Sequence, residues 1–155
     1  MNDTPQDRRR PRVMIVEDEA VVAADLSQSL ARMGCDVVAM ASTGEQAVRL
    51  ARDVNLDAVL MDIRLGRGMD GIHATSRIHE QSDVPVIYVT AHSDLQTLRL
   101  AQGTSPSGFL LKPFEERMLE ATVQMAIYRH ARQRYQTGMD ATPDARSLRD
   151  FGINE

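Results

Sequence analysis

Short apolar runs alternate with amphipathic stretches along most of this chain. The runs are rich in β-branched residues and cover five segments, at residues 12–17, 36–41, 58–62, 85–90 and 108–111. The stretches between them repeat apolar residues every three or four positions, which is the spacing of one helix face. In the first stretch this stripe is Val22, Leu26, Leu30 and Met33, and the following Gly34 is a typical helix terminator. The pattern predicts strands and helices in alternation.

Later stretches repeat the helical spacing, at residues 47–54, 72–79 and, more weakly, 95–102. Three of the strand segments, residues 13–16, 58–61 and 86–89, are apolar throughout, as in strands that are buried on both faces. Five strands that alternate with five helices predict an α/β fold, in which a doubly wound parallel sheet carries helices on both faces.

The last helical stretch is longer than such a sheet can cover. Neither Gly nor Pro interrupts residues 114–135, and about 22 residues of helix span ~33 Å. The overhang, from Arg129 to Tyr135, leads into a polar tail that carries Leu148, Phe151 and Ile153. The extended C-terminal helix and tail predict homodimerisation through this segment. A frayed helix with a disordered tail is the alternative.

Composition places the chain among globular proteins. Its 155 residues are 43% hydrophobic, which predicts one domain with a substantial core after a disordered arm at residues 1–11. Aromatic residues make up 4% and the net charge is −4, so no direct nucleic-acid partner is expected. Arginines near both ends are interpreted as solvated charges. The single Cys35 and the lack of an apolar leader or membrane-length run predict a cytoplasmic protein.

Polar residues with matching chemistry stand at the ends of four predicted strands: Glu17 and Asp18, then Asp62, Thr90 and Lys112. Because the carboxyl ends of parallel strands meet at one edge, we expect these side chains to lie together, where such folds bind ligands. Crowded carboxylates beside one ammonium require a divalent cation, and Mg²⁺ prefers such oxygen ligands. A carboxylate held there can act as a nucleophile toward phosphorus, so the cluster predicts phosphoryl transfer.

Taken singly, each of these residues has a simpler role. Glu17 and Asp18 would favour the N-terminus of the following helix through its dipole. Asp62, Thr90 and Lys112 would be ordinary strand-end or loop residues. The coincidence of four strand ends, each with a group that a magnesium–phosphoryl site needs, favours the site.

Four segments resemble the receiver domains of two-component response regulators. They are MIVEDE (14–19), LMDIRLGRGMDGI (60–72), VIYVTAHSD (86–94) and GFLLKPF (108–114), in the order and spacing of the family. The resemblance covers about residues 12–128 and implies the flavodoxin-like receiver fold, a five-stranded sheet in the order 2-1-3-4-5. Residues 129–155 would then be a helix extension and tail, with no separate output domain expected.

The same resemblance implies the chemistry of the site. Asp62 would be the phosphoacceptor, and a sensor histidine kinase would be the phosphodonor. Glu17 and Asp18 would hold Mg²⁺ together with Asp62 and the backbone carbonyl of Arg64. The phosphorylated protein would signal by contact with an unknown downstream protein.

Further residues take the family's binding, switching and tuning roles. Lys112 would bind a phosphoryl oxygen. Thr90 and Phe109 would form the switch that alters the surface of the fourth helix, fifth strand and fifth helix. Arg64 and His92, two residues beyond Asp62 and Thr90 respectively, would flank the path of the hydrolytic water. A bulky Arg64 predicts shielding and a moderately long-lived phosphorylated form.

The loop after Asp62 departs from the commonest receivers. Eight residues separate Asp62 from Gly71, one more than usual, and Gly66 replaces the usual Pro. The sequence predicts a longer and more flexible loop beside the site.

A single-domain response regulator is the function that these motifs favour, and an aspartate-nucleophile phosphatase or a nucleotide-binding α/β enzyme is the alternative. The chain lacks both common glycine-rich phosphate-binding motifs, and Arg64 stands where such a phosphatase has a second Asp. A transcription regulator would need an output domain. A receiver that cannot be phosphorylated is disfavoured because Glu17, Asp18 and Asp62 are all present. Catalysis beyond self-phosphorylation and autodephosphorylation is not expected.

Overall fold

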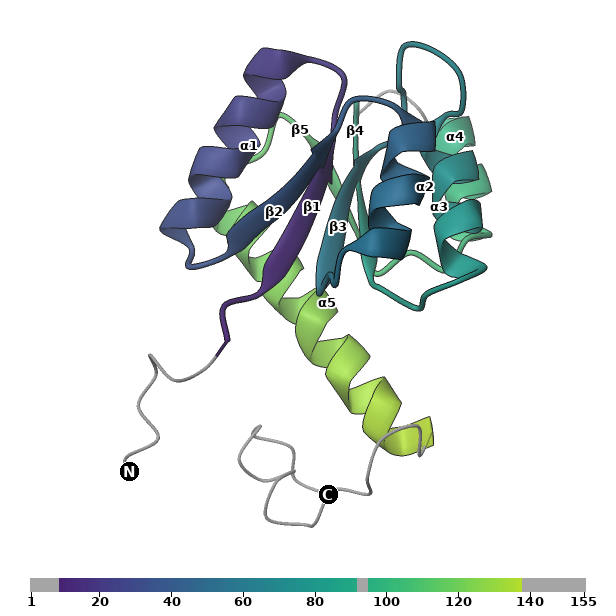
Figure 1. The fold of residues 1–155 in the computed structure, drawn as a ribbon. Helices are drawn as coiled ribbons and strands as arrows, with labels where there is room; N and C mark the ends of the chain where they lie inside the picture. Colours follow the sequence, from purple (N-terminus) through teal and green to yellow (C-terminus); the bar gives the residue numbers. More distant parts are fainter. Residues whose placement is uncertain (1–8, 92–94, 138–155) are drawn as a thin grey trace.

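The computed structural model describes residues 9–91 and 95–137. These residues form a five-stranded parallel sheet in the order β2-β1-β3-β4-β5 (Figure 1). The strands are β1 (Arg12–Val16), β2 (Asp36–Ala41), β3 (Ala58–Asp62), β4 (Val86–Ala91) and β5 (Gly108–Lys112). They alternate with α1 (Ala20–Arg32), α2 (Gly44–Asp53), α3 (Gly71–His79), α4 (Leu95–Gln102) and α5 (Glu116–Thr137). The predicted fold, strand order and long last helix are confirmed.

Helices cover both faces of the sheet, with α1 and α5 on one face and α2, α3 and α4 on the other (Figure 1). The central strand β3 is buried along its whole length, and β1 is buried from its second residue onward. The edge strand β2 is mostly half-buried. Burial on both faces explains why the runs in β1 and β3 are apolar without alternation.

Local signals in the sequence set the helix ends. Thr43 precedes α2, and its hydroxyl accepts a hydrogen bond from the backbone N–H of Gln46 at 3.1 Å. The Gln46 side chain accepts one in return from the backbone N–H of Ser42 at 2.9 Å, a reciprocal cap that satisfies exposed helix donors. At the C-terminal end of α1, the following Gly34 has φ of +89°, the left-handed conformation that ends many helices.

The last helix extends well beyond the amino ends of the strands (Figure 1). The first turn of this overhang is nevertheless attached to the domain. The Arg129 guanidinium donates to the carbonyl of Ser107 at 2.6 Å, and His130 Nε2 lies 3.1 Å from Asp83 Oδ2. The overhang therefore contacts the loops that precede β5 and β4.

Several predictions fall on parts of the chain outside the described residues. These parts are residues 1–8 of the predicted arm, His92, and the tail from residue 138 with its three large apolar residues. Within the arm, Arg9 pairs with Asp57 at 2.9 Å, and Arg10 donates to the carbonyl of Gly34 at 3.0 Å. Among the helices in the described ranges, none combines the length and apolar character that crossing a membrane requires.

Candidate functional site

Strand register brings the predicted site residues to one edge of the sheet. Val16 of β1 lies opposite Met61 of β3, so the next residues, Glu17 and Asp62, stand side by side. Asp62 lies in turn opposite Val89 of β4. One residue further along, Thr90 reaches the same edge, and β5 places Lys112 opposite Ala91.

The ammonium group of Lys112 lies between two of the carboxylates. Its Nζ is 3.5 Å from Glu17 Oε1 and 3.7 Å from Asp62 Oδ2. Backbone N–H groups hold the other oxygens: that of Glu19 donates to Glu17 Oε2 at 3.1 Å, and that of Arg64 donates to Asp62 Oδ1 at 3.0 Å. These contacts hold both carboxylates in place. Asp62 lines a cavity of about 420 Å³ together with Asp18, Arg64, Thr90 and Lys112.

Burial makes the charged form of these carboxylates costly. Glu17 is 4% exposed and Asp62 is 7% exposed. The pKa of Glu17 is raised from 4.5 to about 7, chiefly by desolvation and also by the neighbouring Asp62, against the lowering effects of the Glu19 amide and Lys112. Desolvation also raises the pKa of Asp62, against the lowering effects of Lys112 and the Arg64 amide. One ammonium group does not fully balance the cluster.

The donor set fits a divalent cation. Glu17, Asp18 and Asp62 each offer one oxygen, and these oxygens lie within 4.8 Å of one another. Glu17 Oε1 is buried and makes no hydrogen bond to a described residue, since its ion pair with Lys112 is long, at 3.5 Å. A buried oxygen without a hydrogen bond, close to two further carboxylates, is satisfied by a cation with oxygen preference such as Mg²⁺.

The raised pKa of Glu17 predicts an unusual pH dependence for the metal-free protein. Because the folded state binds this proton more tightly than the unfolded state, the contribution to stability is complete below pH 4.5 and is lost as pH rises through about 7. We expect Glu17→Gln to gain about 1 to 3 kcal/mol relative to the unmodified chain between pH 5 and 8. Urea unfolding of both proteins in chelator across this range measures the difference.

Added Mg²⁺ provides the control for this measurement. A cation binds the ionised carboxylates and not the protonated ones, so it should restore the stability of the unmodified chain at pH 8 and affect Glu17→Gln much less. If the free energy of unfolding changes with pH in the same way in both proteins, Glu17 does not cause the pH dependence.

The predicted switch residues lie on the neighbouring strands β4 and β5, where Thr90 pairs with Leu111 and Phe109 with Tyr88. Thr90 is 2% exposed, and its hydroxyl has no hydrogen-bond partner among the described residues. Phe109 is half-buried, and its ring centroid lies 5.8 Å from that of Tyr88. The Tyr88 hydroxyl in turn contacts Thr104 Oγ1 at 2.7 Å. Tyr88 was missed from the sequence, although its spacing of two from Thr90 places both on the same face of the strand.

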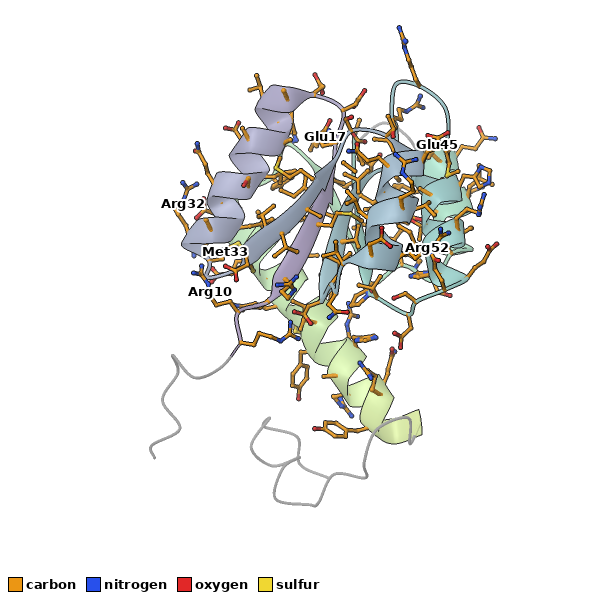
Figure 2. The ribbon with its side chains drawn as sticks, viewed as in Figure 1. Arg10, Glu17, Arg32, Met33, Glu45 and Arg52 are labelled. Atoms are coloured by element: carbon orange, nitrogen blue, oxygen red, sulfur yellow. The ribbon has the colours of Figure 1, made fainter. Side chains whose placement is uncertain are left out.

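The long loop after β3 is attached at two points. The backbone N–H of Gly66 donates to Asp18 Oδ2 at 3.0 Å, and that of Met69 donates to Glu45 Oε2 at 3.1 Å. Figure 2 shows Glu45, from the first turn of α2, at the same end of the sheet as Glu17. The long loop is therefore held by hydrogen bonds to Asp18 and Glu45, and the sequence did not reveal these contacts.

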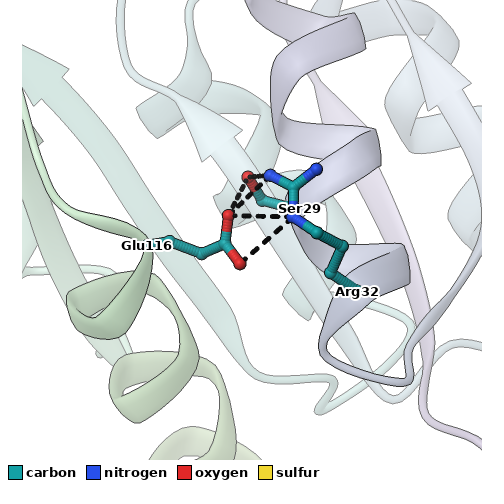
Figure 3. Close-up of polar contacts among 3 residues, drawn as sticks. All are labelled: Ser29, Arg32 and Glu116. Atoms are coloured by element: carbon teal, nitrogen blue, oxygen red, sulfur yellow. Dashed lines mark hydrogen bonds and ion pairs between the residues drawn. The ribbon is translucent and has the colours of Figure 1, made fainter.

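A contact between α1 and α5 lies near the end of β5, where Lys112 stands. Glu116, the first residue of α5, accepts from the Arg32 guanidinium at 2.6 Å and from the Ser29 hydroxyl at 3.1 Å (Figure 3). These residues share a cavity wall with Lys112 and Pro113. The contact joins the first residue of α5 to α1.

The structure thus brings together Glu17, Asp18, Asp62, Thr90, Lys112 and the backbone of Arg64. Phe109 lies behind them against Tyr88. His92 is outside the described residues, so its predicted tuning role stays a prediction.

Comparison with known proteins gives consistent matches. The family model of the response regulator receiver domain matches residues 13–124. The transcriptional regulatory protein PdtaR of Mycobacterium tuberculosis is 35% identical over 118 residues, which cover 76% of this chain and 57% of PdtaR. YrkP of Bacillus subtilis is 35% identical over 121 residues, or 77% of this chain and 50% of YrkP. The chain thus spans only about half the length of these relatives.

Solved structures agree with the fold. The signal receiver domain of a modulated diguanylate cyclase from Desulfovibrio desulfuricans superposes with a TM-score of 0.76 at 34% identity, covering 81% of this chain and 99% of that one. The receiver domain of the sensor histidine kinase PA1611 from Pseudomonas aeruginosa gives 0.71 at 31% identity, covering 77% and 99%. The latter holds a magnesium ion in its active-site cleft.

Proposed function

This chain belongs to the response regulator receiver domain family, and from that premise we propose that it accepts a phosphoryl group on Asp62 from a sensor histidine kinase. Phosphorylation and the use of Mg²⁺ are general to the family. The proposal for this chain adds the acceptor, the ligands and the switch. It describes a signalling protein that does not turn over external substrates.

The arrangement around Asp62 carries the proposal. Its carboxylate is buried at the floor of a cavity, its Oδ1 is held by the Arg64 N–H, and its Oδ2 faces the Lys112 ammonium group. A carboxylate oxygen attacks phosphorus, the new O–P bond forms as the P–N bond of the phosphohistidine breaks, and the electron pair returns to the imidazole nitrogen. Lys112 donates to a phosphoryl oxygen and offsets its charge.

Glu17, Asp18, Asp62 and the Arg64 carbonyl would hold the metal. When bound, Mg²⁺ neutralises charge on the carboxylates and the phosphoryl oxygens, which positions the reactants. The contact of Asp18 with the Gly66 amide orients one of these carboxylates before a ligand arrives. Most of the acceleration then comes from positioning and electrostatic stabilisation.

Thr90 and Phe109 would report the arrival of the phosphoryl group. The unpartnered Thr90 hydroxyl moves toward a phosphoryl oxygen, which vacates space next to Tyr88 and lets Phe109 turn inward. The surface formed by α4, β5 and α5 changes with it, and a downstream protein binds the changed surface.

We propose that the chain acts in the cytoplasm. Homodimerisation through α5 and the tail stays a prediction, since the tail lies outside the described residues.

Incubation with a small acyl-phosphate donor and Mg²⁺ tests the proposal directly. We expect one phosphoryl group per chain, detected by intact mass and located at Asp62 by peptide mapping. The absence of incorporation in the folded protein, or its location elsewhere, would contradict the proposed acceptor.

Arg64 is expected to lengthen the life of the phosphorylated form. Its side chain lines the cavity in front of Asp62 and restricts the approach of water. We predict that Arg64→Asn shortens the half-life of the aspartyl phosphate on the order of threefold to tenfold, equivalent to about 1 kcal/mol in the barrier. Following the decay of phosphorylated protein after removal of the donor measures this change.

Arg67→Asn is the matched control, because Arg67 is an exposed residue of the same loop that does not line the cavity. Equal half-lives for the unmodified chain and Arg64→Asn would show that Arg64 does not shield the site.

A further inference from the structure

A second cavity lies at the amino edge of the sheet, away from the phosphorylation site. It measures about 770 Å³ and is enclosed by the start of β1, the end of α2, the loops before β3 and β4, and the overhang of α5. In Figure 2, Arg52 lies toward this end of the sheet and Glu17 toward the other. The length of β3 separates the two edges, about 16 Å for five residues. The volume is in the range of small-ligand sites.

The cavity is locally basic in an acidic protein. Four arginines line it, together with two carboxylates, Asp57 and Asp83. Both carboxylates lie beside other groups of the protein. Asp57 accepts from the Arg9 guanidinium at 2.9 Å and from the backbone N–H of Arg12 at 2.8 Å, and Asp83 lies 3.1 Å from His130.

Two of these arginines contact neutral acceptors instead of carboxylates. Arg12 Nε donates to the carbonyl of Asn55 at 2.9 Å, and Arg52 Nε donates to the side-chain oxygen of Gln81 at 3.0 Å. Neutral acceptors orient a guanidinium group without cancelling its charge. Within residues 9–91 and 95–137, no carboxylate lies within ion-pairing distance of either side chain. Their terminal amino groups remain available as donors.

We propose that this cavity binds a small phosphate-bearing anion through Arg12 and Arg52. Oriented guanidinium forks match the oxygens of phosphate in pairs, which favours phosphate over a single-point anion. No Phe, Tyr or Trp is found among the described residues that line the cavity, so the guanidinium groups are its main binding features. Recognition therefore centres on the phosphate groups. α5 supplies one wall of the cavity, through His130 and Arg134.

Inorganic pyrophosphate is the probe, titrated into the ¹⁵N-labelled full chain in chelator at constant ionic strength. We expect saturable shifts of the backbone amides of Asn55, Gln81 and Ser82. Arg12→Gln and Arg52→Gln should each weaken binding about tenfold, since each removes charge-assisted hydrogen bonds. Circular dichroism of both variants verifies that they are folded.

Two control variants distinguish binding in this cavity from a general charge effect and from binding at the phosphorylation site. Arg49→Gln removes the same charge from an exposed position of α2 outside the cavity, and it should change affinity by less than about twofold. Lys112→Ala removes the ammonium group of the phosphorylation site and should leave these shifts intact. Unsaturable shifts, equal losses in Arg49→Gln and Arg52→Gln, or loss of binding in Lys112→Ala would each overturn the proposal.

Discussion

Asp62→Asn is expected to abolish phosphorylation of this protein by its kinase and by small phosphodonors. The amide lacks the ionised oxygen that attacks phosphorus, so labelling should fall by at least about a hundredfold. The fold should survive the change. Burial raises the pKa of the Asp62 carboxyl, which means that the charged form is unfavourable in the folded state. The neutral amide should therefore stabilise the metal-free protein.

The two readouts together distinguish a lost acceptor from a lost fold. Labelling is followed by intact mass and stability by urea unfolding in chelator. Asp53→Asn, at an exposed position of α2, serves as the control and should be labelled normally. Stoichiometric labelling of Asp62→Asn would contradict the assignment of Asp62 as acceptor. If Asp62→Asn loses labelling because it unfolds, the variant cannot test the acceptor. Peptide mapping of the phosphorylated unmodified chain would then identify the acceptor residue.

Gly71→Ala is expected to destabilise the protein by about 2 to 3 kcal/mol. Gly71 is the first residue of α3, where Ala is normally the better helix former by up to ~1 kcal/mol. Here an added Cβ would overlap the carbonyl oxygen of Asp62 and lie 2.9 Å from the Cα of Ile63. Both are backbone atoms at the strand end that carries the proposed acceptor, so the clash displaces the candidate site itself. Urea unfolding measures the loss, and the rate of phosphorylation should fall with it.

Gly103→Ala is the matched control for this substitution. Gly103 follows α4, and the nearest atom to an added Cβ there is the carbonyl oxygen of Leu100 at 3.4 Å, which requires little adjustment. We expect its stability to change by less than about 0.5 kcal/mol. If Gly71→Ala unfolds at the same urea concentration as the unmodified chain, the close approach of α3 to β3 is not required for the fold.

The fold could be predicted because the local signals agree with one another. Runs of apolar residues in β1 and β3 have no alternation, which indicates burial on both faces, and Thr43 and Gly34 mark helix ends by their own backbone preferences. Placement of the site follows from the same logic. Once strands are parallel, the residues that end them meet at one edge, so Glu17, Asp62 and other polar residues could be grouped before their distances were known.

Contacts between distant segments could not be predicted in this way. The attachment of Met69 to Glu45 and the packing of Phe109 on Tyr88 depend on how elements far apart in sequence are oriented in space. The arginines near the two ends of the chain were interpreted as solvated charges. In the structure, Arg12 from the first strand and Arg134 from the last helix line one cavity with Arg52.

By itself, the sequence determined the order of strands and helices and the residues that stand at the carboxyl ends of the strands, on which the proposed chemistry of the site rests. These follow from backbone propensity and periodicity, which act over a few residues. Only the tertiary structure decided how the long loop is anchored, where the overhang of α5 attaches and which arginines converge at the opposite edge. Those features arise from side-chain contacts across the sheet, and no short-range pattern encodes them.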